Sequence, residues 1–83
     1  EGKPFDDAQL GLEWRGMCNR MPKKYVALAQ RMKNIDPVIT DYPLVEAVAD
    51  NTFLANEIIE IKPRIEKTLQ IALGCPDLKL SVR

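Results

Sequence analysis

Apolar residues recur at helical spacing in the first third of the chain, and this pattern predicts two helices. The first is expected from about Asp6 to Met21, where Asp6 and Asp7 suit the N-terminal end of a helix dipole. Pro22 interrupts the pattern, and a second helix is expected from there to Lys33, because proline is tolerated in a first helical turn. The two apolar stripes consist of Leu10, Trp14, Met17, Cys18 and Met21, and of Tyr25, Leu28, Ala29 and Met32. We expect Trp14 to anchor the packing of the first helix.

The middle of the chain predicts a β-hairpin. Asp36-Pro37 excludes helix and begins an extended stretch, because the residue before a proline avoids the helical region. Val38 to Asp41 is the first predicted strand, Tyr42-Pro43 the turn, and Leu44 to Ala49 the second strand. A loop this short joins antiparallel neighbours. The side chains of Asp50-Asn51-Thr52 are suited to cap the helix that follows.

The last third of the chain predicts a helix interrupted by proline and then a strand. Pro63 lies in the middle of an apolar helical pattern, so the helix either kinks or divides into two short helices that meet near Lys62. Gly74 is the predicted C-cap, and Pro76 prevents continuation of the helix. Alternating apolar and polar residues then predict a strand with one face in the core. The apolar positions are Leu54, Ile58, Ile61, Ile65, Leu69 and Ala72 in the helix, and Leu78, Leu80 and Val82 in the strand.

These elements predict an α+β fold in the order helix, helix, strand, strand, kinked helix, strand. The helices should pack on one face of a three-stranded sheet. The chain has 83 residues, enough for one domain spanning residues 1–83. Hydrophobic residues make up 46% of it, which is too many for a disordered segment. Because the first residue is Glu1, we expect a domain excised from a larger protein.

Charged residues are separated into blocks, although the formal net charge is zero. The stretch from Trp14 to Asn34 holds six basic residues and no acidic one, and the stretch from Ile35 to Ile61 holds six acidic residues and no basic one. Two interpretations remain open. The blocks neutralise each other within the fold, or the basic block forms a helical face for an acidic partner or for nucleic acid. The basic residues are Arg15, Arg20, Lys23, Lys24, Arg31 and Lys33, and the acidic residues are Asp36, Asp41, Glu46, Asp50, Glu57 and Glu60.

Residue types needed for most catalytic sites are missing or dispersed. The chain has no histidine, which excludes Ser-His-Asp and Cys-His catalysis and histidine-ligated metals. Gly11 and Gly16 have the outer spacing of a phosphate-binding loop, but Met17 and Cys18 stand where that loop needs lysine and serine or threonine. We therefore expect no enzymatic activity in this chain by itself, and no catalytic, cofactor-binding or metal-binding residues.

Cysteine usage indicates an intracellular protein. Cys18 and Cys75 are too few for a disulfide framework and are expected to be reduced thiols. The chain has no signal peptide and no apolar run that could cross a bilayer, so we expect a cytoplasmic protein without membrane contact. Met17, Met21 and Met32 are suited to core packing, with an adaptable binding surface as the alternative.

The predicted element order resembles that of a nucleic-acid-binding fold. The order helix-strand-strand-helix-helix-strand is also that of the type II KH fold, in which a Gly-x-x-Gly loop between two central helices clamps the nucleic-acid backbone. Glu60-Ile61-Lys62-Pro63-Arg64 occupies the corresponding link and contains no glycine. The chain therefore resembles a degenerate type II KH fold that lacks the clamp.

Longer stretches of the chain resemble the C-terminal domain of the gamma/tau subunit of bacterial DNA polymerase III, in its Bacteroidetes form. The resemblance covers nearly the whole chain and rests on the overall pattern, because none of its segments is a catalytic signature. The segments are Glu13-Trp14, Met17-Cys18-Asn19-Arg20-Met21-Pro22, Ala29-Gln30-Arg31-Met32-Lys33-Asn34-Ile35, the hairpin ending in Asp50-Asn51, Ile65-Glu66-Lys67-Thr68-Leu69, and Leu78-Lys79-Leu80-Ser81-Val82-Arg83.

This resemblance implies a non-catalytic protein-interaction domain. In that family the clamp-loader ATPase lies N-terminal to this region, and the C-terminal region of the tau form tethers the polymerase catalytic subunit and the replicative helicase during DNA replication. The family also continues past the strand ending at Arg83 into a helical tail. The implied partners are other DNA polymerase III subunits and the helicase, with a KH-like nucleic-acid-binding domain as the alternative function. We expect at most weak nucleic-acid binding. The candidate contact residues for a partner or nucleic acid are Arg20, Lys23, Lys24 and Arg31.

Overall fold

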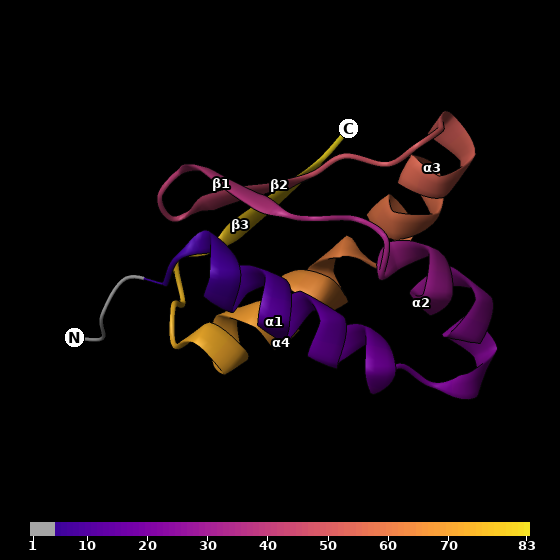
Figure 1. The fold of residues 1–83 in the computed structure, drawn as a ribbon, viewed down its shortest axis with the longest axis horizontal. Helices are drawn as coiled ribbons and strands as arrows, with labels where there is room; N and C mark the ends of the chain where they lie inside the picture. Colours follow the sequence, from indigo (N-terminus) through magenta and orange to yellow (C-terminus); the bar gives the residue numbers. More distant parts are fainter. Residues whose placement is uncertain (1–4) are drawn as a thin grey trace.

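The computed structural model describes residues 5–83 and has an α+β fold in which helices cover one face of a sheet (Figure 1). The strands are β1 (Val38–Asp41), β2 (Leu44–Ala47) and β3 (Lys79–Val82). The helices are α1 (Asp7–Asn19), α2 (Val26–Met32), α3 (Thr52–Glu60) and α4 (Lys62–Leu73), and a short 3-10 turn, η1 (Lys23–Tyr25), precedes α2. The predicted fold class and element order are confirmed.

Strand β2 lies at the centre of a mixed sheet with the order β1-β2-β3. It pairs with β1 antiparallel, which confirms the predicted hairpin, and with β3 parallel. Ile39, Val45 and Leu80 are neighbours across the three strands, and all three contribute to the core. β2 ends before the predicted Ala49, although the Ala49 N–H still donates a hydrogen bond of 2.8 Å to the carbonyl of Arg83.

The two N-terminal helices differ from the predicted ranges, 6–21 and 22–33, where they meet. The start of α1 is as expected, because the Asp6 side chain accepts a hydrogen bond of 2.8 Å from the Gln9 N–H and satisfies a free donor of the first turn. Pro22 adopts an extended conformation with a ψ of 158°. Since proline also lacks a backbone N–H, the helical hydrogen bonds stop before it, and the chain re-enters a helix through the tighter η1 turn.

Pro63 divides the third helical segment into two helices, which is one of the two predicted outcomes. Ile61 separates α3 from α4 and leaves helical geometry with φ −111° and ψ 14°. Pro63 then lies in the first turn of α4, where its missing N–H breaks no intrahelical hydrogen bond. The Asn51 side chain caps α3 by accepting a hydrogen bond of 2.8 Å from the Leu54 N–H. Gly74 ends α4 in the left-handed conformation, with a φ of 63°, as its C-cap role requires.

Polar side chains from the helices bind backbone groups at both edges of the sheet. Asp7 of α1 accepts a hydrogen bond of 3.0 Å from the Ile39 N–H in β1. Glu66 of α4 accepts one of 2.8 Å from the Leu80 N–H in β3, and the Gln70 side chain donates one of 2.9 Å to the carbonyl just before β3. These contacts attach α1 and α4 to the sheet and occupy edge groups that could otherwise pair with another chain.

The core fills the space between the sheet and the helices. Trp14 is fully buried, and its Nε1 donates a hydrogen bond of 2.8 Å to the Met32 carbonyl at the end of α2. The prediction that Trp14 anchors the first helix is therefore confirmed. Cys18 and Cys75 are buried free thiols, as expected. The largest fully buried side chains are Trp14, Leu10, Met32, Ile58, Ile65, Leu69, Leu78 and Val45.

Candidate functional site

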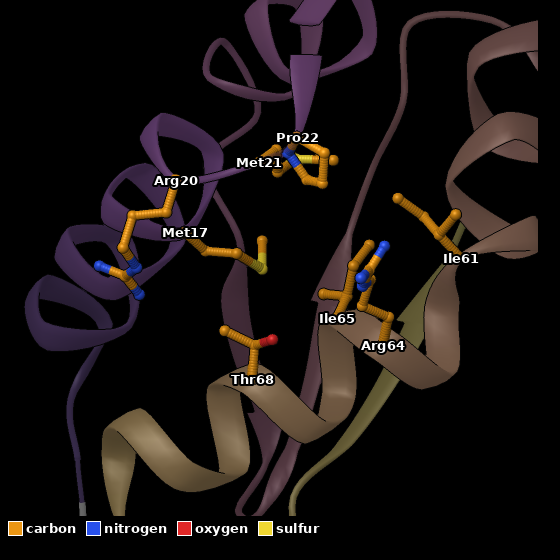
Figure 2. Close-up of a pocket in the computed structure, with 8 residues that line it drawn as sticks. All are labelled: Met17, Arg20, Met21, Pro22, Ile61, Arg64, Ile65 and Thr68. Atoms are coloured by element: carbon orange, nitrogen blue, oxygen red, sulfur yellow. The ribbon is translucent and has the colours of Figure 1, made fainter. Parts of the chain in front are cut away.

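A hollow of about 260 Å³ opens between the C-terminal end of α1 and the N-terminal half of α4 (Figure 2). Its two sides are far apart in the sequence, and the packing of α1 against α4 brings them together. The chain that leaves α1 at Met21 and Pro22 borders one end of it. The lining residues are Met17, Arg20, Met21, Pro22, Ile61, Arg64, Ile65 and Thr68.

The floor of the hollow is apolar and continuous with the core. Met17 is 5% exposed and Ile65 is 2% exposed, and Met21 and Ile61 are partly buried against the core cluster. Figure 2 shows the Met17 side chain extending from α1 toward α4. Because the methionine side chain is unbranched and polarisable, it adapts to the shape of an apolar group placed against it. Of the predicted methionine stripe, Met17 and Met32 belong to the buried core, and Met17 and Met21 line the hollow.

Two arginines flank this apolar floor. Arg20, in the turn after α1, lies back along the helix, and a Cβ placed on Gly16 would stand 3.3 Å from its Nη1. The absence of a side chain at Gly16 therefore makes room for the guanidinium. Arg64 comes from the first turn of α4, and its guanidinium carbon lies 6.0 Å from the centroid of the Tyr25 ring. Within residues 5–83, neither arginine forms an ion pair.

Tyr25 lies beside the hollow and lines a second groove between α2 and α3. Its ring is approached by two cations, the Lys24 Nζ at 5.2 Å and the Arg64 guanidinium at 6.0 Å from the centroid. Both contacts have the geometry of cation–π interactions. Ile61 lines the hollow as well as the second groove, so the two depressions are neighbours. The second groove is lined by Lys24, Tyr25, Ala27, Leu28, Arg31, Glu57, Glu60 and Ile61.

The four contact residues predicted from the sequence do not line one depression. Arg20 lines the hollow, Lys24 and Arg31 line the second groove, and Lys23 is exposed in η1. Arg31 donates a hydrogen bond of 2.8 Å to the Glu57 carboxylate, and the two side chains are 47% and 32% exposed. This cation of the basic block is thus paired with a carboxylate of the acidic block. Arg31 therefore fits the interpretation that the two charge blocks neutralise each other, whereas Arg20 forms no ion pair within the described residues.

Arg64 is a site residue that the sequence analysis missed. It belongs to the link that corresponds to the KH clamp, where the absence of glycine argues against a clamp but says nothing of the arginine. A signal was present in the return of basic residues after the acidic block, at Lys62, Arg64 and Lys67. That signal does not single out Arg64, because only the fold shows that this residue faces the end of α1.

Neither of the titratable groups with a shifted pKa value lines the hollow. Burial raises the pKa of the Cys18 thiol to about 11, and the positive charge of Lys33 lowers it by a smaller amount. A thiol that stays protonated is a poor nucleophile. The Tyr42 hydroxyl donates a hydrogen bond of 3.6 Å to the Cys75 sulfur, and this contact is the main cause of a raised Tyr42 pKa. These groups give no reason to place bond-making chemistry in the hollow.

Among residues 5–83, no group of three or more histidine, cysteine, aspartate or glutamate side chains is arranged to hold a metal ion. None of the helices in that range has the length and hydropathy of a membrane span. The hollow offers an apolar surface with two arginines beside it, and these residue types are suited to binding another molecule.

Comparison with known proteins places most of the chain in one family. A search of curated proteins and a search of solved structures each found no match. Residues 8–83 match the family described as Domain of unknown function (DUF8439). The matched range includes every residue that lines the hollow. The chain belongs to the DUF8439 family.

Proposed function

We propose that this chain is a non-catalytic protein-interaction domain of the gamma/tau subunit of a bacterial clamp loader, where it tethers replisome components in the cytoplasm. The sequence resemblance supports this assignment and names the partners, which are the polymerase catalytic subunit and the replicative helicase. The ATPase of the parent subunit would lie outside this chain.

The observation that carries the proposal is the apolar hollow between α1 and α4, with two arginines beside it. Well-packed apolar pockets that receive a side chain of the partner supply much of the free energy of protein association. The segment from Met17 to Pro22, one of those that carry the gamma/tau resemblance, supplies one wall of the hollow.

The test is direct binding between purified proteins from one organism. The domain, and separately its parent chain with any C-terminal tail, is titrated against the polymerase catalytic subunit and the replicative helicase by isothermal titration calorimetry. We expect at least one of them to bind, with an affinity that falls much less steeply with salt than that of a nucleic-acid complex, because the apolar part of the interface is not screened. A parent chain that binds neither protein would refute the tether.

The KH-like nucleic-acid-binding domain is the second candidate function. Two observations favour it, namely the helix and strand order and the cluster of cations Arg20, Lys23, Lys24 and Arg64 around η1 and the start of α4. Phosphate binding needs several unopposed cations, and Arg31 of the same region is already paired with Glu57. We expect weak binding of single-stranded DNA that is lost as salt rises, measured by fluorescence anisotropy. Tight binding that survives near-physiological salt would favour this function over the tether.

A further inference from the structure

We propose that the hollow binds an acidic peptide segment of a partner protein. One bulky apolar side chain of that segment enters between α1 and α4, and carboxylates next to it pair with Arg20 and Arg64. This inference rests on the proposed interaction function and specifies the chemistry of the partner.

The size of the hollow suits a single side chain. Its volume of about 260 Å³ is below the range of roughly 300–1,000 Å³ that is usual for pockets that hold whole small molecules. Its walls are two helical segments, and its floor is formed by the thioether of Met17 and the aliphatic side chains of Ile61 and Ile65. An aliphatic or aromatic side chain placed there would lose contact with water and gain contact with these groups.

The charge around the hollow determines which flanking residues suit it. Arg20 lines the hollow from the end of α1, with its guanidinium lying back along that helix (Figure 2), and Arg64 lines it from α4. Neither arginine is paired with a carboxylate within residues 5–83. Lys23 and Lys24 follow directly after the wall formed by Met21 and Pro22. An arginine binds a carboxylate by charge-assisted and often bidentate hydrogen bonds, so acidic residues on either side of the apolar anchor complement this rim.

The composition of the floor favours a peptide over nucleic acid. Proteins that bind single strands stack bases on flat aromatic rings. The lining residues of the hollow are methionine, isoleucine, proline, threonine and arginine, with no aromatic ring among them. The neighbouring ring of Tyr25 is already approached by Lys24 and Arg64. The hollow thus lacks the feature that would recognise a base.

The experiment selects a displayed library of short random peptides against the immobilised domain and measures the affinity of selected peptides by fluorescence anisotropy. Two variants change the hollow: Arg64→Glu reverses its charge, and Thr68→Trp fills it from the side of α4. Lys67→Glu is the matched control, because Lys67 is exposed on the same helix, carries the same charge and does not line the hollow. Circular dichroism and a thermal melt confirm that each variant is folded.

We expect the selected peptides to share a bulky apolar residue with acidic neighbours. Their affinity should fall by about tenfold or more with Arg64→Glu and with Thr68→Trp, and by less than about threefold with Lys67→Glu. Replacing the apolar anchor of the peptide by alanine should have an effect as large as Thr68→Trp.

Four results would overturn the inference: a library that yields no binder, selected peptides without this signature, binding that a folded Thr68→Trp variant retains, or displacement of the peptide by a single-stranded oligonucleotide. Self-association of the domain that Thr68→Trp abolishes would assign the hollow to a second copy and overturn it as well. The tether is tested separately with the whole subunits. If they bind the domain while the peptides fail, the interaction function stands and uses another face.

Discussion

Trp14 is the side chain whose loss we expect to weaken this fold most clearly, and Trp14→Ala is the test. The indole is fully buried, and its Nε1 donates to the Met32 carbonyl at 2.8 Å, so it joins α1 to α2. Truncation of a buried large aromatic residue to alanine costs about 3–5 kcal/mol, because the cavity that remains is only partly filled by relaxation. The hydrogen bond adds about 1 kcal/mol. This addition is small because the Met32 carbonyl also accepts a hydrogen bond of 3.0 Å from the Ile35 N–H and keeps that partner.

This loss is large compared with the stability of a domain of this size. At about 0.05–0.15 kcal/mol per residue, a chain of 83 residues has a free energy of unfolding of about 4–12 kcal/mol. Trp14→Ala thus removes between a third and all of it. Trp14→Phe keeps an aromatic ring in the site but loses the Nε1 hydrogen bond and part of the volume, so we expect it to cost about 1–3 kcal/mol.

The assay is urea denaturation followed by far-ultraviolet circular dichroism. Intrinsic fluorescence is unsuitable for this comparison, because Trp14 is the single tryptophan of the chain. Leu12→Ala is the matched control on the same helix, since Leu12 is 62% exposed and its truncation should change the free energy of unfolding by less than about 0.5 kcal/mol. Equal unfolding free energies for Trp14→Ala and Leu12→Ala would refute the anchoring role of Trp14.

Three further predictions concern single residues. Gly74→Ala should lower the free energy of unfolding by about 1 kcal/mol in urea titrations. Residue 74 has a φ of 63° and its added Cβ would meet nothing within 4 Å, so the whole effect is backbone strain. Gly74→Asn should cost less, because asparagine tolerates this conformation better, and an equal cost for both variants would contradict this reason. Glu66→Ala should lower the free energy of unfolding by about 1–2 kcal/mol and speed hydrogen exchange at the Leu80 N–H, because that N–H loses its acceptor. Glu66→Gln should have intermediate effects. Unchanged exchange would show that the carboxylate does not cover the edge of β3. The free energy of unfolding should fall between pH 9 and pH 11. The Cys18 thiol has its ordinary pKa of 9.0 in the unfolded chain and a pKa of about 11 in the folded chain. Only the unfolded state therefore releases this proton in that range, which favours unfolding as the pH rises. Cys18→Ala should lose this part of the slope, and an identical slope in that variant would be the contrary result.

Local signals in the sequence determined where most helices and strands lie. Asp6 and Asn51 begin helices by accepting hydrogen bonds from backbone N–H groups in the first turn, and Gly74 ends a helix because it adopts the left-handed conformation. Pro63 divides a helix through the hydrogen bond that its own nitrogen lacks. Such effects do not depend on the rest of the fold, which is why they can be read from the chain. The least accurate prediction was the region around Pro22, which adopts an extended conformation with a ψ of 158°, so that the chain re-enters a helix only through η1.

The strand order, the covered edges of the sheet and the hollow were decided by the tertiary structure. The wall at Met17 and the wall at Ile65 are nearly fifty positions apart, and only the packing of α1 on α4 makes them one surface. The hydrogen bond from Leu80 to Glu66 likewise joins residues that no short-range pattern relates. Contacts of this kind depend on the geometry of the whole fold, and the periodicity of one segment contains no information about its partner.

The charged residues show most clearly what the sequence determined and what the tertiary structure decided. The sequence alone revealed that basic and acidic residues are separated into blocks, and it marked Arg20 and Arg31 as equivalent candidates. The fold places Arg31 at 2.8 Å from Glu57 and leaves Arg20 beside an apolar hollow, opposite an arginine that the block pattern did not include. Electrostatic energy depends on the distance between charges and on their exposure to water. Order along the chain specifies neither, so the sequence could indicate which side chains were candidates, and only the folded structure could show which of them remain free to bind.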